Sequence, residues 1–474
     1  GARMGGEVHL DGRDVTALPE RAMCEVRGRG IGMIFQEPMT ALNPVRTIGD
    51  QVAETLIVHG AASRRAARAE AADRLARVGL DPAHIPPARF PHELSGGQRQ
   101  RVCIAMAVAL RPRLLIADEP TTALDVTTQA RILDLLARLV AEEGMGLILI
   151  THDLAVVAGM AHRVAVMQAG RIVEEGETEQ LFRRMRHPCT RALLAASTHR
   201  PAARPAPPGE PLLEVAGATR RYGGGGLIRR GPGPRAVDDV SLTIRRGESV
   251  GLVGESGSGK STLTHAILGL DPLQGGEIRL FGRRVHPGMA RDLRAGMQVV
   301  FQDPFASFNP RWRVRRLIAE PVHLMARRPD DLPARVATAL EEVGLSPSDG
   351  ERFIHEFSGG QRQRIAIARA LIIRPDLIIL DEAVSALDVR VRARILDLLA
   401  ELRARHGLSY LFIAHDLTVV RAITDRVLVM QAGRIVEEGP TERVLTAPGH
   451  DHTRSLIGAA PAIPEGWQPE APDG

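Results

Sequence analysis

The sequence predicts an α/β protein made of two tandem copies of one domain, each with a mainly parallel sheet at its core. Two observations carry this prediction. Long stretches of the first half return almost unchanged in the second half, and the apolar runs of each copy are short and end in polar residues. Such runs are typical of strands buried on both faces of a parallel sheet, whose carboxyl ends present polar side chains.

The repeat is evident from four pairs of segments at a constant offset of 263 residues. From it we predict a first domain at 1–197, a second at 212–461, a Pro- and Ala-rich linker at 198–211 and a disordered tail at 462–474. The paired segments are HELSGGQRQR and HEFSGGQRQR (92–101 and 355–364), LLIADEPTTALDV and LIILDEAVSALDV (114–126 and 377–389), THDLAVV and AHDLTVV (151–157 and 414–420), and VMQAGRIVEEG (166–176 and 429–439).

The first copy is expected to be truncated at its N-terminal end. GGEVHLDG at 5–12 matches GGEIRLFG at 275–282, so the counterpart of the stretch before 275 would lie ahead of residue 1. By this comparison the copy is short of roughly sixty residues. A fragment or a misassigned start explains this better than a naturally shortened protein, and either way the first copy is expected to expose a sheet edge.

Composition excludes several classes of protein. The chain has 474 residues, of which 44% are hydrophobic and 25% charged, a globular balance. No apolar run is long enough to span a bilayer, and no secretory signal is visible. Cys24, Cys103 and Cys189 are too few and too scattered for a disulfide framework or a zinc site, which favours the cytosol. The arginines alternate with acidic residues as on solvated helix faces, so we expect no nucleic-acid partner.

The segment GESGSGKST contains the only lysine of the chain, Lys260. It fits the pattern G-x-x-x-x-G-K-[ST], follows a strand-like run and precedes a helical one, which is the context of a phosphate-binding loop. Backbone N–H groups and the helix N-terminus would hold phosphate, Lys260 would contact the β- and γ-phosphates, and Ser261 would offer a hydroxyl to Mg²⁺. A compact ammonium fits inside such a loop where a planar guanidinium does not. We expect ATP to bind at Gly254, Glu255, Ser256, Gly257, Ser258, Gly259, Lys260, Ser261 and Thr262.

Polar residues at the ends of the apolar runs predict the catalytic groups. Asp381 would hold Mg²⁺, and Glu382 would orient or deprotonate the attacking water. His415 follows another run and is expected at the γ-phosphate, and Gln302 could contact both Mg²⁺ and water. The counterparts in the first copy are Asp118, Glu119, His152 and Gln36.

Two further features point to anion and base recognition. The SGGQ segments begin helical stretches, where Ser and Gly expose backbone donors. Tyr222 precedes a Gly-rich loop and is a candidate for stacking on adenine, with a core position as the alternative. The SGGQ residues are Ser95, Gly96, Gly97 and Gln98, and Ser358, Gly359, Gly360 and Gln361.

Over nearly its whole length the chain resembles the nucleotide-binding subunits of ABC transporters. The resemblance implies two P-loop NTPase domains with a helical signature subdomain each, a Walker A motif at 254–261, a Walker B motif at 377–382 and D-loops at Ala123–Asp125 and Ala386–Asp388. QEPMTALNP (36–44), QDPFASFNP (302–310) and HPCTRALLAAS (187–197) are similar to segments of the oligopeptide, dipeptide and nickel importers. Cys189, where that family usually has Tyr, and HDHTRSLIGAAP (450–461) depart from the pattern.

The resemblance further implies an ATP- and Mg²⁺-dependent motor of an importer, most plainly for di- and oligopeptides. Its partners would be two transmembrane permease subunits and, indirectly, an extracytoplasmic substrate-binding protein, at the cytoplasmic face of the inner membrane. The two copies would pair head to tail, so that Lys260 faces Ser95–Gln98. Nickel, glutathione-like or opine cargo is an alternative. Two rival functions are a soluble tandem ATPase acting on ribosomes or DNA and a regulatory module without activity.

Overall fold

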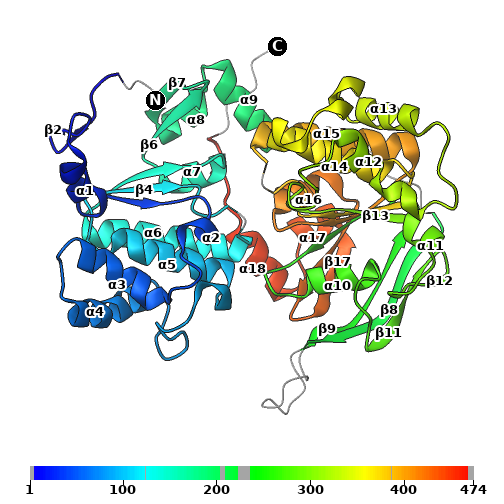
Figure 1. The fold of residues 1–474 in the computed structure, drawn as a ribbon, viewed down its shortest axis with the longest axis horizontal. Coiled ribbons are helices and arrows are strands. Elements are labelled where there is room, and N and C mark those ends of the chain that lie inside the picture. The colour runs from blue at the N-terminus through cyan, green and yellow to red at the C-terminus, as the bar shows by residue number, and fades with distance from the viewer. Residues whose placement is uncertain (1–4, 123, 203–208, 223–234, 386, 468–474) are drawn as a thin grey trace. The chain divides into compact units, whose positions relative to one another are not determined.

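The structure is a computed structural model that describes residues 5–122, 124–202, 209–222, 235–385 and 387–467. Two compact units form within it (Figure 1). Unit 1 comprises 1–124, 128–186 and 461–474, and unit 2 comprises 125–127 and 187–460. The predicted D-loop residues Ala123 and Ala386, part of the linker and the end of the tail lie outside the described residues.

Unit 2 is built on a six-stranded sheet in the order β13-β14-β15-β10-β16-β17. Every neighbouring pair is parallel except β16 and β17. The central strands are nearly all apolar and buried, as both faces of the sheet are covered. The strands are β10 (Ser249–Val253), β13 (Met297–Val300), β14 (Leu377–Asp381), β15 (Ser409–Ile413), β16 (Arg426–Gln431) and β17 (Arg434–Pro440).

A second, antiparallel sheet in unit 2 has the order β12-β11-β8-β9. A core cluster that includes Leu213, Leu252, Leu263 and Leu411 lies between this sheet, the six-stranded sheet and the helix after β10. The strands are β8 (Pro211–Arg221), β9 (Arg235–Arg245), β11 (Gly275–Leu280) and β12 (Arg283–Arg284).

A second core cluster of unit 2 packs the other face of the sheet against helices. It joins the helical segment 314–371 to β14, β15 and α15 through residues such as Leu340, Ile365 and Leu399. The helices of unit 2 are α9 (Pro188–Ser197), α10 (Lys260–Ile267), α11 (Arg291–Ala295), α12 (Val314–Ile318), α13 (Leu332–Glu342), α14 (Gly359–Leu371), α15 (Val389–His406), α16 (Leu417–Ile423), α17 (Thr441–Thr446) and α18 (Asp451–Ala459), with 3₁₀ turns at Glu320–Leu324, Pro347–Glu351 and Ile354–Glu356.

Unit 1 repeats the helical side of this design with a smaller sheet. Its strands form a parallel sheet β3-β4-β5 and separate pairs β6-β7 and β1-β2. One core cluster packs the three-stranded sheet against helices α3 to α6. The elements are β1 (His9–Leu10), β2 (Arg13–Asp14), α1 (Glu20–Arg29), β3 (Ile31–Ile34), α2 (Pro38–Ala41), α3 (Ile48–Val58), α4 (Arg64–Arg77), α5 (Gly96–Val108), β4 (Leu114–Asp118), α6 (Val126–Glu143), β5 (Gly146–Ile150), α7 (Leu154–Met160), β6 (Arg163–Gln168), β7 (Arg171–Glu177) and α8 (Thr178–Arg184), with a 3₁₀ turn at Pro91–Glu93.

The compact units do not follow the predicted domain boundaries in two places. Residues 187–197, predicted to end the first domain, cluster with unit 2, where the Arg390 guanidinium donates to Cys189 Sγ at 2.8 Å. The described part of the predicted disordered tail clusters with unit 1, where the rings of Trp467 and Phe182 lie 6.0 Å apart. Neither contact leaves a periodic signal in the sequence.

Candidate nucleotide site

The phosphate loop joins β10 to α10 in unit 2, as the sequence predicts. Three glycines allow its path, since each has a positive φ: 156° at Gly254, 80° at Gly257 and 109° at Gly259. A Cβ at Gly254 would collide with the carbonyl oxygen of Met430, and one at Gly259 with that of Ala236. The backbone therefore needs glycine at these two positions both for its conformation and for its close packing.

Lys260 is the first residue of α10 and is 7% exposed. Its ammonium donates to the carbonyl oxygens of Gly254 at 2.7 Å and Glu255 at 2.9 Å, and lies 3.5 Å from Ser258 Oγ. Burial lowers the pKa of Lys260, against the opposing negative charges of Glu382 and Asp381. The lone lysine is thus held within the loop, with two carboxylates near enough to influence its charge.

Asp381 and Glu382 lie at the carboxyl end of β14, where they were expected. Burial raises the pKa of Asp381, and the negative charge of Glu382 adds to the effect. Burial opposes ionisation of Glu382 as well, but the pKa of Glu382 is lowered because His415 interacts with it, Nδ1 lying 3.4 Å from Oε2. Glu382 has a positive φ of 48°. This strained backbone, an ionised carboxylate and a histidine beside it are typical of a general base and its partner.

The first copy forms the same group of side chains. His152 Nδ1 lies 3.1 Å from Glu119 Oε1, and Gln36 Nε2 donates to Glu119 Oε2 at 2.8 Å. The histidine contact is the main reason that the pKa of Glu119 is lowered. Glu119 repeats the positive φ, at 45°. The structure therefore brings Gln36, Glu119 and His152 together, next to Asp118 at the end of β4.

The SGGQ segments begin α5 and α14 with the same cap. Ser95 Oγ accepts from the Gln98 backbone N–H at 3.3 Å, and the Gln98 side chain accepts from the Ser95 N–H at 3.0 Å. Ser358 and Gln361 repeat this capping box. Ser95, Gly96, Ser358 and Gly359 are exposed, whereas Gly97 and Gly360 have no room for a Cβ beside Thr128 and Val391. Both helix ends thus present backbone donors to an external group.

Other predicted residues stand apart from these groups. Gln302 follows β13 and is exposed. Gln36 of the first copy is exposed too, but its side-chain amide donates to Glu119. Tyr222 is 45% exposed at the end of β8, with its hydroxyl donating to Asp271 at 3.2 Å and the Arg220 guanidinium 5.2 Å from its ring. The alternative of a core tyrosine is therefore wrong, and stacking on a base stays a prediction.

The sequence analysis did not single out a hydroxyl that contacts the predicted catalytic group. Thr122 Oγ1 donates to Glu119 Oε2 at 2.9 Å, and its counterpart Ser385 donates to the backbone oxygen of Glu382 at 2.8 Å. A hydroxyl three residues after the glutamate in both copies was the available signal.

The residues present fit a magnesium ion held together with a nucleotide. Ser261, at the start of α10, is exposed and offers a hydroxyl, and Asp381 offers a carboxylate at the end of β14. No group of three or more His, Cys, Asp or Glu side chains suited to a metal occurs among the described residues. The Ser261 hydroxyl and the Asp381 carboxylate match Mg²⁺, which keeps several of its waters and is bound through one or two protein ligands plus phosphate oxygens.

A glycine loop around a buried lysine, before a strand that ends in Asp-Glu, defines the class: a P-loop nucleotide hydrolase. The family model "ABC transporter" matches residues 2–122 and 237–385, and "Oligopeptide/dipeptide transporter, C-terminal region" matches 173–217 and 436–473. The chain belongs to the ATP-binding proteins of the ABC transporter family, and it is an ATPase of that family with an oligopeptide/dipeptide transporter C-terminal region.

Curated relatives match nearly the whole chain. The peptidoglycan transport ATP-binding protein of Agrobacterium fabrum is 48% identical over 96% of this chain and 84% of its own. The glutathione import ATP-binding protein of Escherichia coli K12 is 48% identical over 97% of this chain and 79% of its own. A solved structure from Clostridium perfringens, part of an ABC transporter complex, covers 50% of this chain and 91% of its own at 28% identity and a TM-score of 0.45. None of the described helices is long and apolar enough to cross a bilayer.

Proposed function

We propose that the chain is the ATP-hydrolysing motor of an importer for short peptides, working at the cytoplasmic face of the inner membrane with two permease subunits. The observation that carries this proposal is the Lys260, Glu382 and His415 group in a chain whose C-terminal regions match those of oligopeptide and dipeptide transporters. The two relatives above are named for glutathione and peptidoglycan. Both compounds contain short peptides, which favours peptide cargo over nickel. An extracytoplasmic binding protein would deliver the cargo.

In this proposal Mg²⁺ bound with ATP would be held by Ser261, Asp381 and Gln302, and would neutralise phosphate charge. Lys260 binds the β- and γ-phosphates, and Glu382 accepts a proton from the attacking water while His415 keeps it ionised. ATP stabilises one conformation of the motor because it binds that conformation more tightly, and hydrolysis removes the preference. This cycle would drive the permease subunits.

Reconstitution tests the function directly. The chain would be placed in proteoliposomes with two candidate permease subunits and a candidate binding protein from the same organism. Loading that binding protein with di- or oligopeptides or with glutathione should raise phosphate release several-fold, and nickel should not. Stimulation by nickel alone would contradict the peptide proposal. A rate of phosphate release that is unchanged by the permeases but rises with ribosomes or DNA would contradict the proposed importer function.

We further propose that the SGGQ segment of the first copy, Ser95–Gln98, contacts the nucleotide bound at Lys260 in a head-to-tail arrangement. Membership of the ABC transporter family supports this proposal. Ser95→Arg should then reduce phosphate release by at least about tenfold while ATP binding persists, since the γ-phosphate loses its second contact. Ser358→Arg is the matched control, because its cap is the same. Equal loss from both substitutions, or from neither, would contradict the arrangement.

A further inference from the structure

Helix α9 carries the sequence of the first copy, yet it packs on the second. It belongs to unit 2 by its contacts, and within that unit it lies against α15. Cys189 is 5% exposed and Thr190 is 0% exposed, so the first turn of α9 is buried. We call residues 188–200, which are α9 and the three residues after it, the α9 arm.

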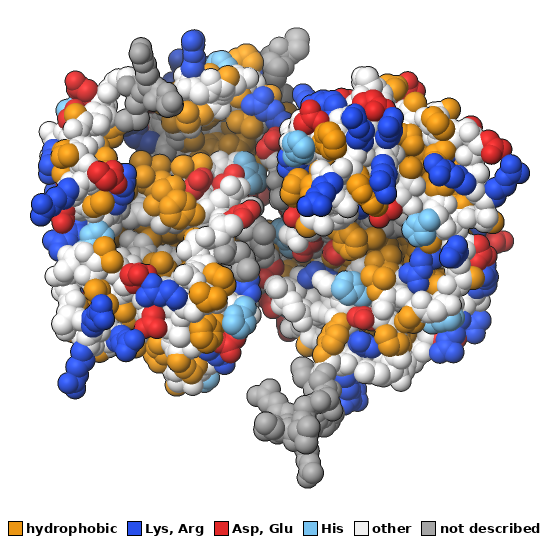
Figure 2. Space-filling view, in the orientation of Figure 1, with side chains coloured by type: hydrophobic (Ala, Val, Ile, Leu, Met, Phe, Trp, Pro, Cys, Tyr) orange, Lys and Arg blue, Asp and Glu red, His pale blue; other side chains and the backbone are white. Residues whose placement is uncertain are grey.

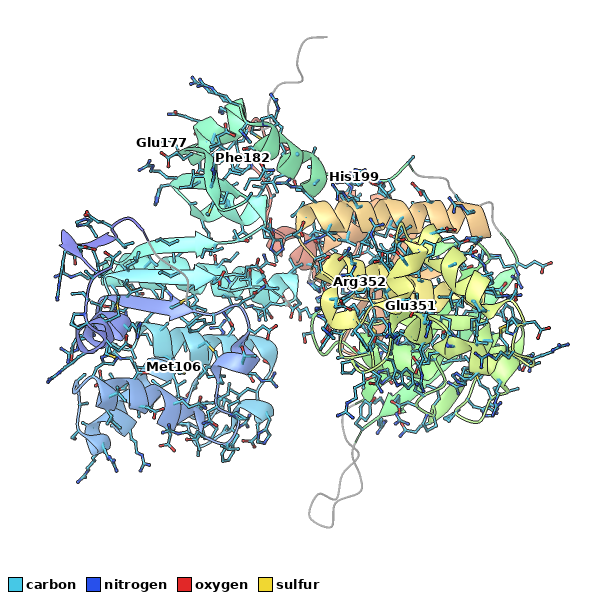
Figure 3. The ribbon with its side chains drawn as sticks, turned by 45° about the horizontal axis from the view of Figure 1, so that its top comes forward. Met106, Glu177, Phe182, His199, Glu351 and Arg352 are labelled. Atoms are coloured by element: carbon cyan, nitrogen blue, oxygen red, sulfur yellow. The ribbon has the colours of Figure 1, made fainter. Side chains whose placement is uncertain are left out.

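The α9 arm is fastened to α15 near both of its ends. At its start, the Arg390 guanidinium donates to Cys189 Sγ at 2.8 Å. Near its end, His199 Nε2 lies 2.6 Å from Asp397 Oδ1, and Figure 3 shows His199 where the arm meets α15. Because Arg390 and Asp397 are about two helical turns apart on α15, the arm follows this helix and does not touch it at a single point.

The last residue of the arm reaches a second element, α17. The Arg200 guanidinium donates to Glu442 Oε1 at 2.9 Å. Glu442 also accepts from Arg421 of α16, whose Nη2 lies 2.7 Å from Oε2. One carboxylate therefore joins the end of the arm to the C-terminal half of α16, the helix that follows His415 in the sequence.

The first turn of α15 reaches the other end of α16. Arg392, two residues after the Arg390 that contacts the arm, donates to Asp416 Oδ2 at 2.5 Å. The two side chains are 17% and 28% exposed, so water screens this pair only in part. Asp416 caps α16 by accepting from the Thr418 N–H at 2.8 Å. Since His415 directly precedes Asp416, a displacement of this cap would displace His415 too.

These contacts matter because they converge. Figure 2 shows basic side chains mixed with acidic ones over the visible face of unit 2, and a single exposed ion pair contributes little to stability. The α9 arm is different, because its two routes through α15 and α17 end on the same short helix, Leu417–Ile423. That helix follows the histidine whose Nδ1 lies 3.4 Å from Glu382 Oε2.

We propose that the α9 arm positions His415 beside Glu382 and thereby supports ATP hydrolysis at the Lys260 site. This inference rests on the proposed roles of Glu382 and His415. The arm acts through α15 and α16, so its members are positioning residues and not catalytic ones. A segment of the first copy thus takes part in the chemistry of the second.

The alternative is a purely structural role for the α9 arm. In that case, loss of the arm lowers Tm but leaves kcat and its pH dependence unchanged in the folded protein. The contacts favour positioning, because a brace for stability alone has no reason to connect with both ends of the helix next to His415.

The first test displaces the arm in the intact chain. Thr190→Arg places a charged side chain in a buried position and should release α9 from α15. Amide exchange over 189–197 should then become at least about tenfold faster. The kcat for phosphate release should fall at least about fivefold, with less than about a twofold change in KM for ATP, because Lys260 still holds the phosphates. Native kcat with fast exchange, or unchanged exchange, overturns the proposal.

The second test uses milder substitutions with a matched control. Asp397→Asn weakens the contact with His199, and Cys189→Ala removes the acceptor of Arg390; together they should lower kcat at least about threefold. Asp134→Asn changes the exposed counterpart of Asp397 in the first copy and should leave kcat at the native value. Cys189→Ser, used in place of Cys189→Ala, restores an acceptor and should recover part of the loss. Equal losses from Asp134→Asn and Asp397→Asn overturn the proposal.

A double-mutant comparison shows whether the arm acts through His415. Thr190→Arg should lower kcat less than about twofold when His415→Ala is already present. Alone, Thr190→Arg should move the acid side of the pH profile of kcat to higher pH, because Glu382 loses the partner that lowers its pKa. Additive losses in the double mutant, or a lower Tm with an unmoved pH profile, indicate the structural role and overturn the proposal.

Glu382→Gln, measured beside these variants, separates this inference from the proposed function. A native rate of phosphate release in Glu382→Gln refutes the proposed base, and with it the pair that the arm positions. Slow release in Glu382→Gln together with native kcat in Thr190→Arg overturns the role of the α9 arm alone and leaves the proposed function in place.

Discussion

At the scale of single residues, the pKa of each carboxyl group in the nucleotide site is set by two opposing effects, burial and contacts with charged neighbours. Asp381 and Glu382 are neighbours at the end of one strand, yet burial raises the pKa of the first while His415 holds the pKa of the second below its usual range. Two adjacent carboxyls therefore differ in proton affinity. Such a difference favours the proposed base role of Glu382, the more readily ionised group.

The pH dependence of phosphate release should reveal this balance. His415→Ala removes the main interaction that lowers the pKa of Glu382, so burial is then opposed chiefly by the positive charge of Lys260 and the pKa rises. The ionised carboxylate is the active form, so the mutant should lose activity at a higher pH than the native protein as pH falls. The comparison is kcat followed from about pH 8 down past the ordinary glutamate pKa of about 4.3, because the native pKa of Glu382 lies below its usual range. Folding stability follows the same sign: a lowered carboxyl pKa contributes stability that is lost only as pH falls through it.

His152→Ala is the matched control for that profile. It removes the contact between His152 and Glu119 in the first copy. Glu119 is not the glutamate that lies beside Lys260. The acid side of the profile should therefore stay where it is in the native protein. An equal displacement in both mutants would contradict the assignment of His415 to Glu382.

At the scale of elements, strand ends were the most predictable feature. The apolar run before Asp381 and Glu382 predicted a strand, and the structure has β14 ending at Asp381, parallel to its neighbours. The phosphate loop was equally predictable, because the positive φ of its backbone already requires the glycines that the motif contains. In both cases the signal is local: a few consecutive residues determine the geometry.

Features that depend on tertiary neighbours could not be predicted in this way. Tyr222 was a candidate for adenine contact or for the core, and only the structure shows that it is exposed beside Arg220. The helix at 188–197 was expected to end the first domain, yet it clusters with unit 2. The position of this helix in the sequence does not reveal which unit it packs on, because its packing depends on side-chain contacts.

At the scale of the whole molecule, two copies of one design differ in completeness. Unit 2 has a core on each face of its sheet, and unit 1 has the helical-side core alone among its described residues. Sequence comparison predicted this difference from the unmatched stretch before 275. The same comparison predicts a single phosphate loop, so nucleotide binding by this chain should depend on Lys260.

Equilibrium ATP binding and phosphate release, measured side by side on Lys260→Ala and Glu382→Gln, test the central claim most directly. The account predicts that Lys260→Ala weakens ATP binding by at least about tenfold and abolishes release, because the buried ammonium holds the phosphates. Glu382→Gln should bind ATP as the native chain does and release phosphate at least about a hundredfold more slowly. Native ATP affinity in Lys260→Ala, or native phosphate release in Glu382→Gln, would contradict it.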